Sequence, residues 1–490
     1  MPHKKIILAI PPQVGLSKDH LPSIGVGYLA AVLEKNGYEV KIIDSFVEEL
    51  DNSQTVDLII KEAPFLLGVS ATTHNRFNAM EILNRVKEKS NNEIFTVVGG
   101  PHFSLIADQA IVNIPSLDFV VRGEGEETML RLASQLVEDG GIRTENLAKI
   151  NGLTFRNNGK PVSNSDREFI KNLDSLPSPA WHLFSINKYN ARLEGIIKYR
   201  AIGVMSSRGC PQDCVFCVNS AFWKKFFRHH SPKRFVDEIE FLHKKYGFRA
   251  FDFWDDTLTI FKPHVIEICN EIIKRNLSIK WYTRARVNTV DFELLSLMKR
   301  AGCRAISFGV ESGSEKILRI IQKKITIQQV WDAAKACKEL DLNTKFFFVH
   351  SLPGETKEDF NITLDLIDKL NAYSPNFHCY EGIARIYPGT QLETLAKKEG
   401  KLPVDFDWCA KVDFGYVGEL GADSTIPLYD NGYLSFEKII ESVKQRKRQR
   451  AKKQNLGTLV KKGIKIFFQI RNFSDFKSAI RNFVDLRFKK

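Results

Sequence analysis

Three cysteines lie close together in the chain, as Cys210, Cys214 and Cys217, directly after a short apolar run that is typical of a buried strand. Their C-x3-C-x2-C spacing brings three thiolates round one concave loop. Three thiolates leave one iron of a [4Fe–4S] cluster without a protein ligand, and such an open position is where a metal centre does chemistry. The alternative is a Cys3His zinc site with His229 or His230, but zinc cysteines usually come in pairs and no second pair follows. We therefore predict an iron–sulfur cluster at this loop.

The cysteine loop belongs to a series of alternating strand and helix patterns that must position it. Six units of this kind predict an incomplete, TIM-type (β/α)6 barrel over residues 200–400. In such a barrel the chemistry lies in the loops at the carboxyl ends of the parallel strands. The candidate strands are Ile202–Ser206, Ala250–Trp254, Lys280–Arg284, Ala305–Val310, Thr344–His350 and Phe377–Ile386.

Several polar or small residues follow these strands and so face the same end of the predicted barrel. Each has a structural alternative: an aspartate caps the next helix, a glutamate is a surface carboxylate, and a glycine completes a turn. The residues at these positions are Asp255, Asp256, Glu311, Ser312 and Gly354.

Residues 200–395 resemble the radical S-adenosylmethionine (SAM) superfamily. The resemblance rests on the cysteine spacing with Phe216 before the third cysteine, on Phe251–Asp256 and Ala285–Asn288, on Ala301–Gly313, and on the Leu-Pro-Gly-Glu-Thr and Tyr-Pro-Gly-Thr loops. It implies a [4Fe–4S] cluster that cleaves SAM and a low-potential electron donor of the flavodoxin or ferredoxin type. It also implies a set of SAM-binding residues, which are Phe216, Asp255, Asp256, Glu311, Ser312 and Gly354. It identifies no catalytic group beyond the three cluster ligands.

Residues 1–145 predict a doubly wound, Rossmann-like α/β domain with a parallel sheet. Short continuous apolar runs alternate with helical patterns, as expected for strands buried on both faces. Ser70-Ala71-Thr72 and Gly99-Gly100 follow two of these strands, where a ligand binds in this architecture.

This part resembles the cobalamin-binding domain that often precedes a radical SAM barrel. The resemblance implies that Ser70, Thr72, Gly99 and Gly100 bind cobalamin. The chain lacks an Asp-x-His-x-x-Gly motif, so we predict no histidine below the cobalt, and the loop residues His74 and His102 are only neighbours of the expected site. The alternative is a flavodoxin-like domain that binds substrate or no corrinoid.

The remaining segments are a linker with a small hairpin at 146–199 and a C-terminal region at 401–490. The net charge of +13 belongs to the tail, because residues 441–490 alone hold 16 Lys/Arg against 3 Asp/Glu. The basic run 444–453, followed by Phe and Ile at helical spacing, predicts a basic amphipathic helix. It either contacts an anionic membrane surface or an acidic partner, or packs on the barrel. Nucleic acid is not an expected partner, since the basic charge is confined to the tail.

Composition sets the remaining limits. Of the 490 residues, 43% are hydrophobic and 26% charged, as in ordinary soluble proteins. The other five cysteines are scattered singly, which fits a reducing compartment. No apolar run approaches the ~18 residues that a membrane span needs. We expect a cytoplasmic protein whose membrane contact, if it has any, lies in the C-terminal region.

These features together predict a cobalamin-dependent radical SAM enzyme that modifies an unactivated carbon, with C-methylation as the leading reaction. A radical oxidative cyclase or another non-methylating radical enzyme is one alternative. A non-catalytic corrinoid- or metal-binding module is the other. The substrate, a small molecule or a lipid-like one, is not specified by any motif.

Overall fold

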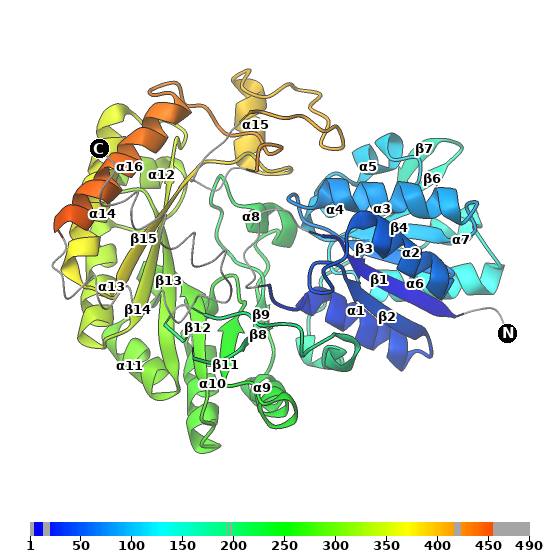
Figure 1. The fold of residues 1–490 in the computed structure, drawn as a ribbon, viewed down its shortest axis with the longest axis horizontal. Helices are drawn as coiled ribbons and strands as arrows, with labels where there is room; N and C mark the ends of the chain where they lie inside the picture. The colour runs from blue at the N-terminus through cyan, green and yellow to red at the C-terminus, as the bar shows by residue number, and fades with distance from the viewer. Residues whose placement is uncertain (1–3, 13–19, 194, 197, 416–422, 454–490) are drawn as a thin grey trace.

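The computed structural model describes residues 4–12, 20–193, 195–196, 198–415 and 423–453. Two α/β parts lie side by side, and the loops after β8 and helix α8 lie between them (Figure 1). The first part confirms the expected doubly wound domain and the second the expected partial barrel. The predicted limits at 145, 199 and 400 remain predictions.

The N-terminal part is built on a sheet whose order, within the described residues, is β2-β1-β3-β4-β5-β6-β7. Strands β1 to β5 are parallel, and β6 and β7 are antiparallel. Its strands are β1 (Lys5–Ile10), β2 (Glu39–Asp44), β3 (Leu66–Ser70), β4 (Phe95–Gly99), β5 (Phe119–Val121), β6 (Leu153–Asn157) and β7 (Lys160–Ser163). Its helices are α1 (Ile24–Lys35), α2 (Asn52–Glu62), α3 (Arg76–Lys89), α4 (Pro101–Leu105), α5 (Ala107–Asn113), α6 (Glu126–Asp139) and α7 (Thr144–Leu147).

Burial on both faces explains why the parallel strands read as continuous apolar runs. In β1, residues 6–10 are all buried under helices on either side. The strand order reverses direction between β1 and β3, and a doubly wound fold binds its ligand outside the carboxyl ends of the strands at such a point. The hairpin predicted after residue 145 is present as β6 and β7, and it extends this sheet by pairing with β5.

The second part is a parallel sheet of order β15-β14-β13-β12-β11-β8 in the chain as described. Its strands are β8 (Ala201–Val204), β11 (Ala250–Phe253), β12 (Lys280–Ala285), β13 (Cys303–Glu311), β14 (Asn343–His350) and β15 (Phe377–Ile383), with the short ribbon β9 (Ser207–Arg208) and β10 (Arg228–His229). The helices are α8 (Val218–Trp223), α9 (Pro232–Tyr246), α10 (Lys262–Lys274), α11 (Phe292–Arg300), α12 (Glu315–Ile320), α13 (Ile327–Glu339), α14 (Lys357–Tyr373), α15 (Gln391–Lys398) and α16 (Phe436–Lys453).

Local sequence signals set the ends of the barrel helices. Helix α9 begins after Ser231, whose hydroxyl accepts from the backbone N–H of Arg234, and it ends at Gly247 in the left-handed conformation. Thr326 and Thr356 cap α13 and α14 with reciprocal capping boxes. These caps satisfy backbone donors that the helix itself leaves unpaired, so each helix returns the chain to the next strand.

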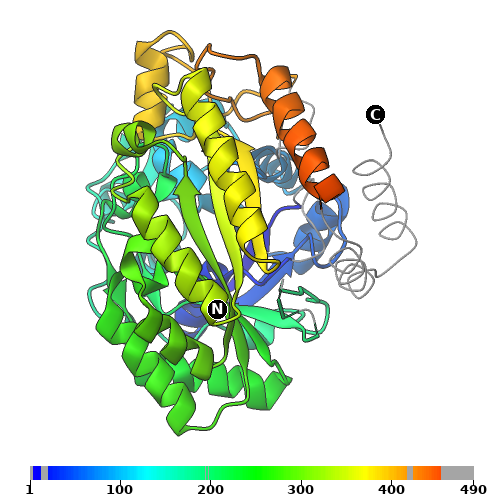
Figure 2. The same cartoon turned by 90° about the vertical axis from the view of Figure 1, so that its left-hand side faces the viewer.

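Helix α16 packs beside α14 (Figures 1 and 2). Ile439 and Val443 are buried, and two of its basic side chains form ion pairs with the barrel. Arg446 contacts Asp368 at 2.7 Å, and Arg450 contacts the same carboxylate at 2.7 Å. The first part of the basic run thus packs on the barrel, whereas the predicted amphipathic helix after residue 453 lies outside the described residues. In the described residues, no helix is long and apolar enough to cross a membrane.

Candidate active site

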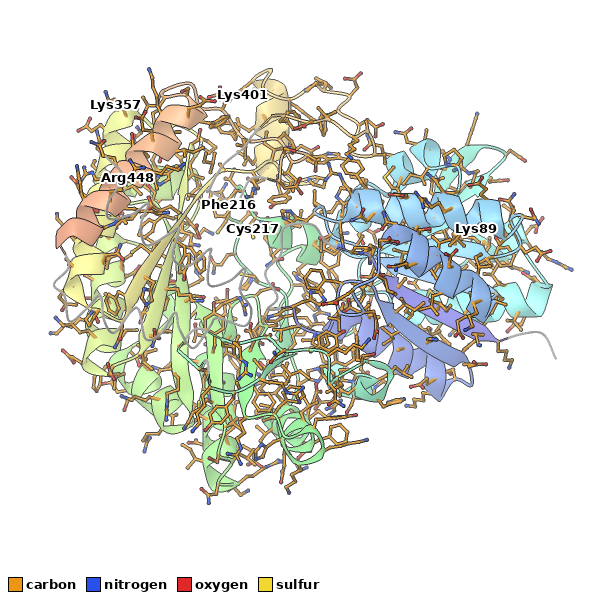
Figure 3. The ribbon with its side chains drawn as sticks, in the orientation of Figure 1. Lys89, Phe216, Cys217, Lys357, Lys401 and Arg448 are labelled. Atoms are coloured by element: carbon orange, nitrogen blue, oxygen red, sulfur yellow. The ribbon has the colours of Figure 1, made fainter. Side chains whose placement is uncertain are left out.

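The ribbon β9–β10 holds the cysteine loop. Gly209 precedes the first cysteine with a φ of 93°, and a Cβ there would lie 1.9 Å from the carbonyl oxygen of Phe226. Only glycine fits this close approach. The loop then turns back towards the sheet before α8, so that Cys210, Cys214 and Cys217 all line one cavity of about 360 Å³. Figure 3 places Phe216 and Cys217 in the middle of the molecule, between the barrel strands and the N-terminal part.

The thiol environment fits a cluster that several thiolates share. The Cys210 sulfur lies 3.8 Å from the Thr257 hydroxyl, and the Cys214 sulfur lies 3.9 Å from the Arg286 guanidinium. Burial raises the pKa of the Cys217 thiol to about 11, so its thiolate needs the positive charge that bound iron provides.

The geometry does not favour the zinc alternative. One ring nitrogen of His229, a predicted fourth zinc ligand, lies 2.9 Å from the backbone oxygen of His230. A zinc ion requires four ligands that converge on one point, whereas the thiolates of a cluster bind different irons. The ring nitrogens of His230 are also engaged, with Tyr28 at 3.1 Å and Asp174 at 3.0 Å.

Three of the predicted SAM residues, Phe216, Asp256 and Glu311, line the same cavity as the cysteines. The Asp256 carboxylate accepts from the Gly209 N–H at 3.2 Å and from the Asn219 amide at 2.6 Å. Burial, and after it the neighbouring Asp255, raises the pKa of Asp256 to about 6.

Glu311 ends β13 in a strained backbone conformation. Its φ is 73°, which is costly for a residue with a side chain and is typical of functional sites. Its carboxylate pairs with the Lys323 ammonium at 2.7 Å, and both groups are buried. Gly309 makes this pair possible, because a Cβ there would lie 2.3 Å from a carboxylate oxygen of Glu311.

The other three predicted SAM residues do not line this cavity. Asp255 is fully buried and accepts from the hydroxyls of Ser206 and Ser207. The Ser312 hydroxyl lies 3.2 Å from that of Thr363. Gly354 has a φ of 71° and its Cβ would lie 2.8 Å from Ile320. Roles in SAM binding stay predictions for all six residues.

Sequence reasoning missed several side chains that line the cavity opposite the cysteines. Tyr282 and Arg284 lie on β12, Ser307 on β13 and Phe347 on β14, whereas Arg286 follows β12 and Lys323 follows α12. Alternation along these strands was the available signal, because inward-facing residues recur at every second position. The missed residues are Tyr282, Arg284, Arg286, Ser307, Lys323 and Phe347.

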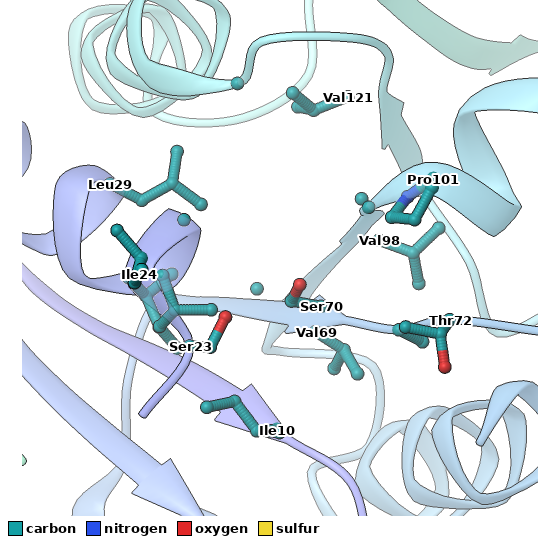
Figure 4. Close-up of a pocket in the computed structure, with 18 of the residues that line it drawn as sticks. Ile10, Ser23, Ile24, Leu29, Val69, Ser70, Thr72, Val98, Pro101 and Val121 are labelled. Atoms are coloured by element: carbon teal, nitrogen blue, oxygen red, sulfur yellow. The ribbon is translucent and has the colours of Figure 1, made fainter. Parts of the chain in front are cut away.

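A second, larger cavity of about 660 Å³ lies at the carboxyl ends of β1, β3, β4 and β5. Ser70, Thr72, Gly99 and Gly100, the four residues predicted to bind cobalamin, all line it. Figure 4 shows Ser70 and Thr72 on one side and Pro101 and Val121 on the other.

Small residues leave room for a ligand in this larger cavity, which we call the cradle. Gly25 and Gly123 line it, and a Cβ at either would meet no atom within 4 Å. Gly100 has a φ of 91°, and a Cβ there would lie 2.6 Å from the carbonyl oxygen of Ala71. The loop therefore stays close to the sheet and leaves the space above it to a bulky ligand, which fits a corrinoid.

His74 lies in the loop after β3, as expected, whereas His102 lies in helix α4 and not in a loop. His74 lines the cavity, with Asp423 3.2 Å from one ring nitrogen and the Tyr387 hydroxyl 3.3 Å from the other. His102 is buried away from the lining, and burial lowers its pKa to about 3. That no histidine lies below the cobalt stays a prediction.

The two parts are clamped by buried charges next to the cysteine loop. The Arg208 guanidinium donates to Glu124 and Glu126 of the N-terminal part, both at 2.7 Å. Arg228, its partner in the ribbon, donates to the other oxygen of Glu124 at 2.8 Å. Arg208, Glu124 and Glu126 also line the larger cavity, so this clamp is shared by the cysteine loop and the cradle.

A chain of three side chains links the linings of the two cavities. Trp254 lines the larger cavity and donates its indole N–H to Asp252 at 2.9 Å. Asp252 in turn accepts from Arg284, which lines the cysteine cavity, at 2.7 Å. Asp252 therefore connects a residue of one cavity lining to a residue of the other.

A three-cysteine loop after the first strand of a parallel barrel fits an iron–sulfur enzyme, and the larger cavity of the N-terminal part offers a site for a second cofactor. Residues 204–367 match the radical SAM superfamily, and residues 14–133 match the B12 binding domain. The chain belongs to the radical SAM superfamily and carries an N-terminal B12-binding domain.

Individual relatives agree with this assignment. The chain is 36% identical to an uncharacterized methyltransferase of Pyrococcus horikoshii over 79% of this chain and 82% of that one. It is 31% identical to the anaerobic magnesium-protoporphyrin IX monomethyl ester cyclase of Rubrivivax gelatinosus, over 73% of this chain and 64% of the cyclase. The fold is similar to that of OxsB, a cobalamin-dependent SAM radical enzyme solved with aqua-cobalamin and SAM. The TM-score is 0.71 at 18% identity, over 91% of this chain and 66% of OxsB.

Proposed function

We propose that this radical SAM enzyme is a cobalamin-dependent methyltransferase that acts on an unactivated carbon. The observation that carries the proposal is the hydrogen-bonded chain of Trp254, Asp252 and Arg284, which links the linings of the two cavities. A substrate in the barrel mouth would lie between SAM on one side and the corrinoid on the other. The Pyrococcus horikoshii relative, named a methyltransferase, supports the same reaction.

The three cysteines would hold the cluster, which supplies the electron that cleaves SAM, while the corrinoid carries a methyl group. Asp256 and Glu311 are the carboxylates best placed to accept hydrogen bonds from the SAM ammonium or ribose. Arg286 also lines this cavity and would suit the SAM carboxylate, whereas the Lys323 ammonium is paired with Glu311. Phe216 would pack against the adenine.

In the N-terminal part, the Ser70 and Thr72 hydroxyls and the Gly99 and Gly100 backbone would hold the nucleotide tail of the corrinoid. The Thr72 hydroxyl lies 3.2 Å from Asn75, which fixes its orientation. The Arg208 clamp would exclude water from the space between the two cofactors, because it buries four charged groups at the domain boundary. Dry surroundings protect a reactive radical from side reactions.

Outside the active site, we propose that a flavodoxin- or ferredoxin-type protein supplies the electron. Membrane contact would fall to the tail after residue 453. The inward ion pairs of Arg446 and Arg450 leave less of α16 for a lipid surface.

Methyl transfer from SAM to the corrinoid can be tested without knowing the substrate. Reduced protein with hydroxocobalamin and CD3-labelled SAM should form S-adenosylhomocysteine and CD3-labelled cobalamin, as measured by mass spectrometry. A cyclase of the kind in Rubrivivax gelatinosus is the second candidate, because of its 31% identity. It would form 5′-deoxyadenosine but no S-adenosylhomocysteine, and that result would refute the methyltransferase proposal.

A further inference from the structure

Two histidines of the described residues, His20 and His74, line the cradle. Both ring nitrogens of His74 lie next to protein groups, Asp423 at 3.2 Å and the Tyr387 hydroxyl at 3.3 Å. His20 differs, because only its Nε2 has such a neighbour, the Asp44 carboxylate at 3.0 Å. In the part of the chain that the structure describes, its Nδ1 has no hydrogen-bond partner. One imidazole nitrogen at the wall of the cradle is therefore left for a ligand.

A buried carboxylate fixes the orientation of the His20 ring. Asp44 is the last residue of β2 and is 4% exposed. The carboxylate oxygen that contacts His20 also accepts from the buried Tyr189 hydroxyl at 2.7 Å. The ring packs against Phe46 with 4.8 Å between the ring centres. Because a carboxylate accepts hydrogen bonds, this contact places the ring proton on Nε2 and leaves a lone pair on Nδ1.

A histidine held in this way is typical of a metal ligand. Metal-binding histidines usually donate their other ring N–H to a carboxylate or a carbonyl group, which sets the tautomer and the ring orientation. A single imidazole does not hold a free metal ion, but it can complete the coordination of a metal that a macrocycle already holds, as a histidine does for haem iron. The corrinoid that fits the cradle carries such a metal, which is cobalt.

We propose that Nδ1 of His20 is an axial ligand of the corrinoid cobalt, and that Asp44 and Tyr189 position this ligand. The inference rests on the proposed function, because it requires a corrinoid in the cradle. It replaces the prediction that no histidine lies below the cobalt, which rested on the missing Asp-x-His-x-x-Gly motif alone. His20 directly follows Asp19 and precedes Gly25 by five residues, so the spacing of that motif does not reveal it.

Electron paramagnetic resonance of cobalt(II) tests the ligand directly, because the nuclear spin of an axial nitrogen splits the cobalt signal. The full chain is loaded with cobinamide, a corrinoid without the nucleotide base, so that an axial nitrogen can come only from the protein. We expect a triplet splitting with unlabelled protein. We expect a doublet when the histidines are labelled with 15N.

Three variants assign the nitrogen to one residue. His20→Ala should lose the splitting, and added imidazole should restore it. Asp44→Asn should bind cobinamide roughly tenfold more weakly, because the residue that orients the ligand is changed. The matched control is His74→Ala, which removes the other histidine of the cradle and should keep the splitting.

The absence of nitrogen splitting in the wild-type protein would overturn the inference, and so would splitting that persists in His20→Ala. The melting temperature and the cobinamide content of each variant are recorded to exclude misfolding. If the wild-type protein forms methylated cobalamin from SAM but shows no splitting with cobinamide, only the axial ligand is wrong. If the wild-type protein retains no corrinoid at all, the proposed function is wrong as well.

Discussion

Replacing Arg208 with methionine would remove the central charge of the domain clamp while keeping a side chain of similar length. The guanidinium is 4% exposed and contacts two carboxylates that are 4% and 6% exposed. Burial lowers the pKa of Arg208, but Glu126 and Glu124 raise it by more, so it stays charged. In the Arg208→Met variant, Glu124 would keep its ion pair with Arg228. Glu126 would have no other ion pair within the described residues. Leaving one buried charge without its partner costs about 3–5 kcal/mol.

A loss of that size should lower the melting temperature by roughly 5–10 °C. It should also weaken corrinoid retention, because the clamp forms part of the cradle wall. Thermal melts followed by near-ultraviolet circular dichroism, with corrinoid absorbance after desalting, measure both effects. The double variant Arg208→Met/Glu126→Gln should recover part of the stability, since no carboxylate is left uncompensated.

The matched control is Arg131→Met, which breaks an exposed pair with Glu127 on α6. It should cost less than about 0.5 kcal/mol. If Arg208→Met is no more destabilising than Arg131→Met and retains corrinoid, the clamp does not hold the two parts together.

Three further predictions concern other sites. Glu311→Gln should weaken SAM binding at least tenfold without loss of iron, because the substitution removes a charge from the SAM cavity. Equilibrium dialysis measures the affinity for SAM, and iron analysis measures the cluster content. An unchanged affinity for SAM would contradict the role assigned to Glu311. Gly99→Leu should abolish corrinoid retention while SAM cleavage persists, because the leucine side chain fills the larger cavity. Retained corrinoid would mean that the corrinoid does not bind in this cavity. Burial raises the pKa of Glu238 from 4.5 to about 7. Between these two pH values the folded state therefore holds a proton that the unfolded chain releases. The free energy of unfolding should fall by up to about 3 kcal/mol as the pH rises from 4.5 to 7. Melting temperatures of Glu238→Gln should lack that part of the pH dependence, and parallel profiles of the two proteins would refute the assignment.

Much of the fold could be predicted from local sequence signals. The continuous apolar runs of residues 1–145 became parallel strands because burial on both faces requires such runs. The six candidate barrel strands appear within a few residues of their predicted ends. The cysteine spacing and the loop glycines were readable because they depend on residues that are neighbours in the chain.

Contacts between distant residues could not be predicted in the same way. The Arg208 clamp joins residues more than 80 positions apart, and neither partner has a sequence signal of its own. Three consecutive phenylalanines lie in β14, and the structure shows that the middle one, Phe347, lines the cysteine cavity. The basic run of α16 was ambiguous between solvent and packing because its inward ion pairs depend on Asp368 of another helix.

The central claim is that the three cysteines hold a cluster that cleaves SAM. The most direct test is anaerobic reconstitution with iron and sulfide, reduction, addition of SAM and quantification of 5′-deoxyadenosine by mass spectrometry. A triple variant, Cys210→Ala/Cys214→Ala/Cys217→Ala, serves as the control. We expect a [4Fe–4S] electron paramagnetic resonance signal and 5′-deoxyadenosine in the wild-type protein, with both lost in the variant and corrinoid retained by both. Zinc in place of iron, with no SAM cleavage, would contradict it.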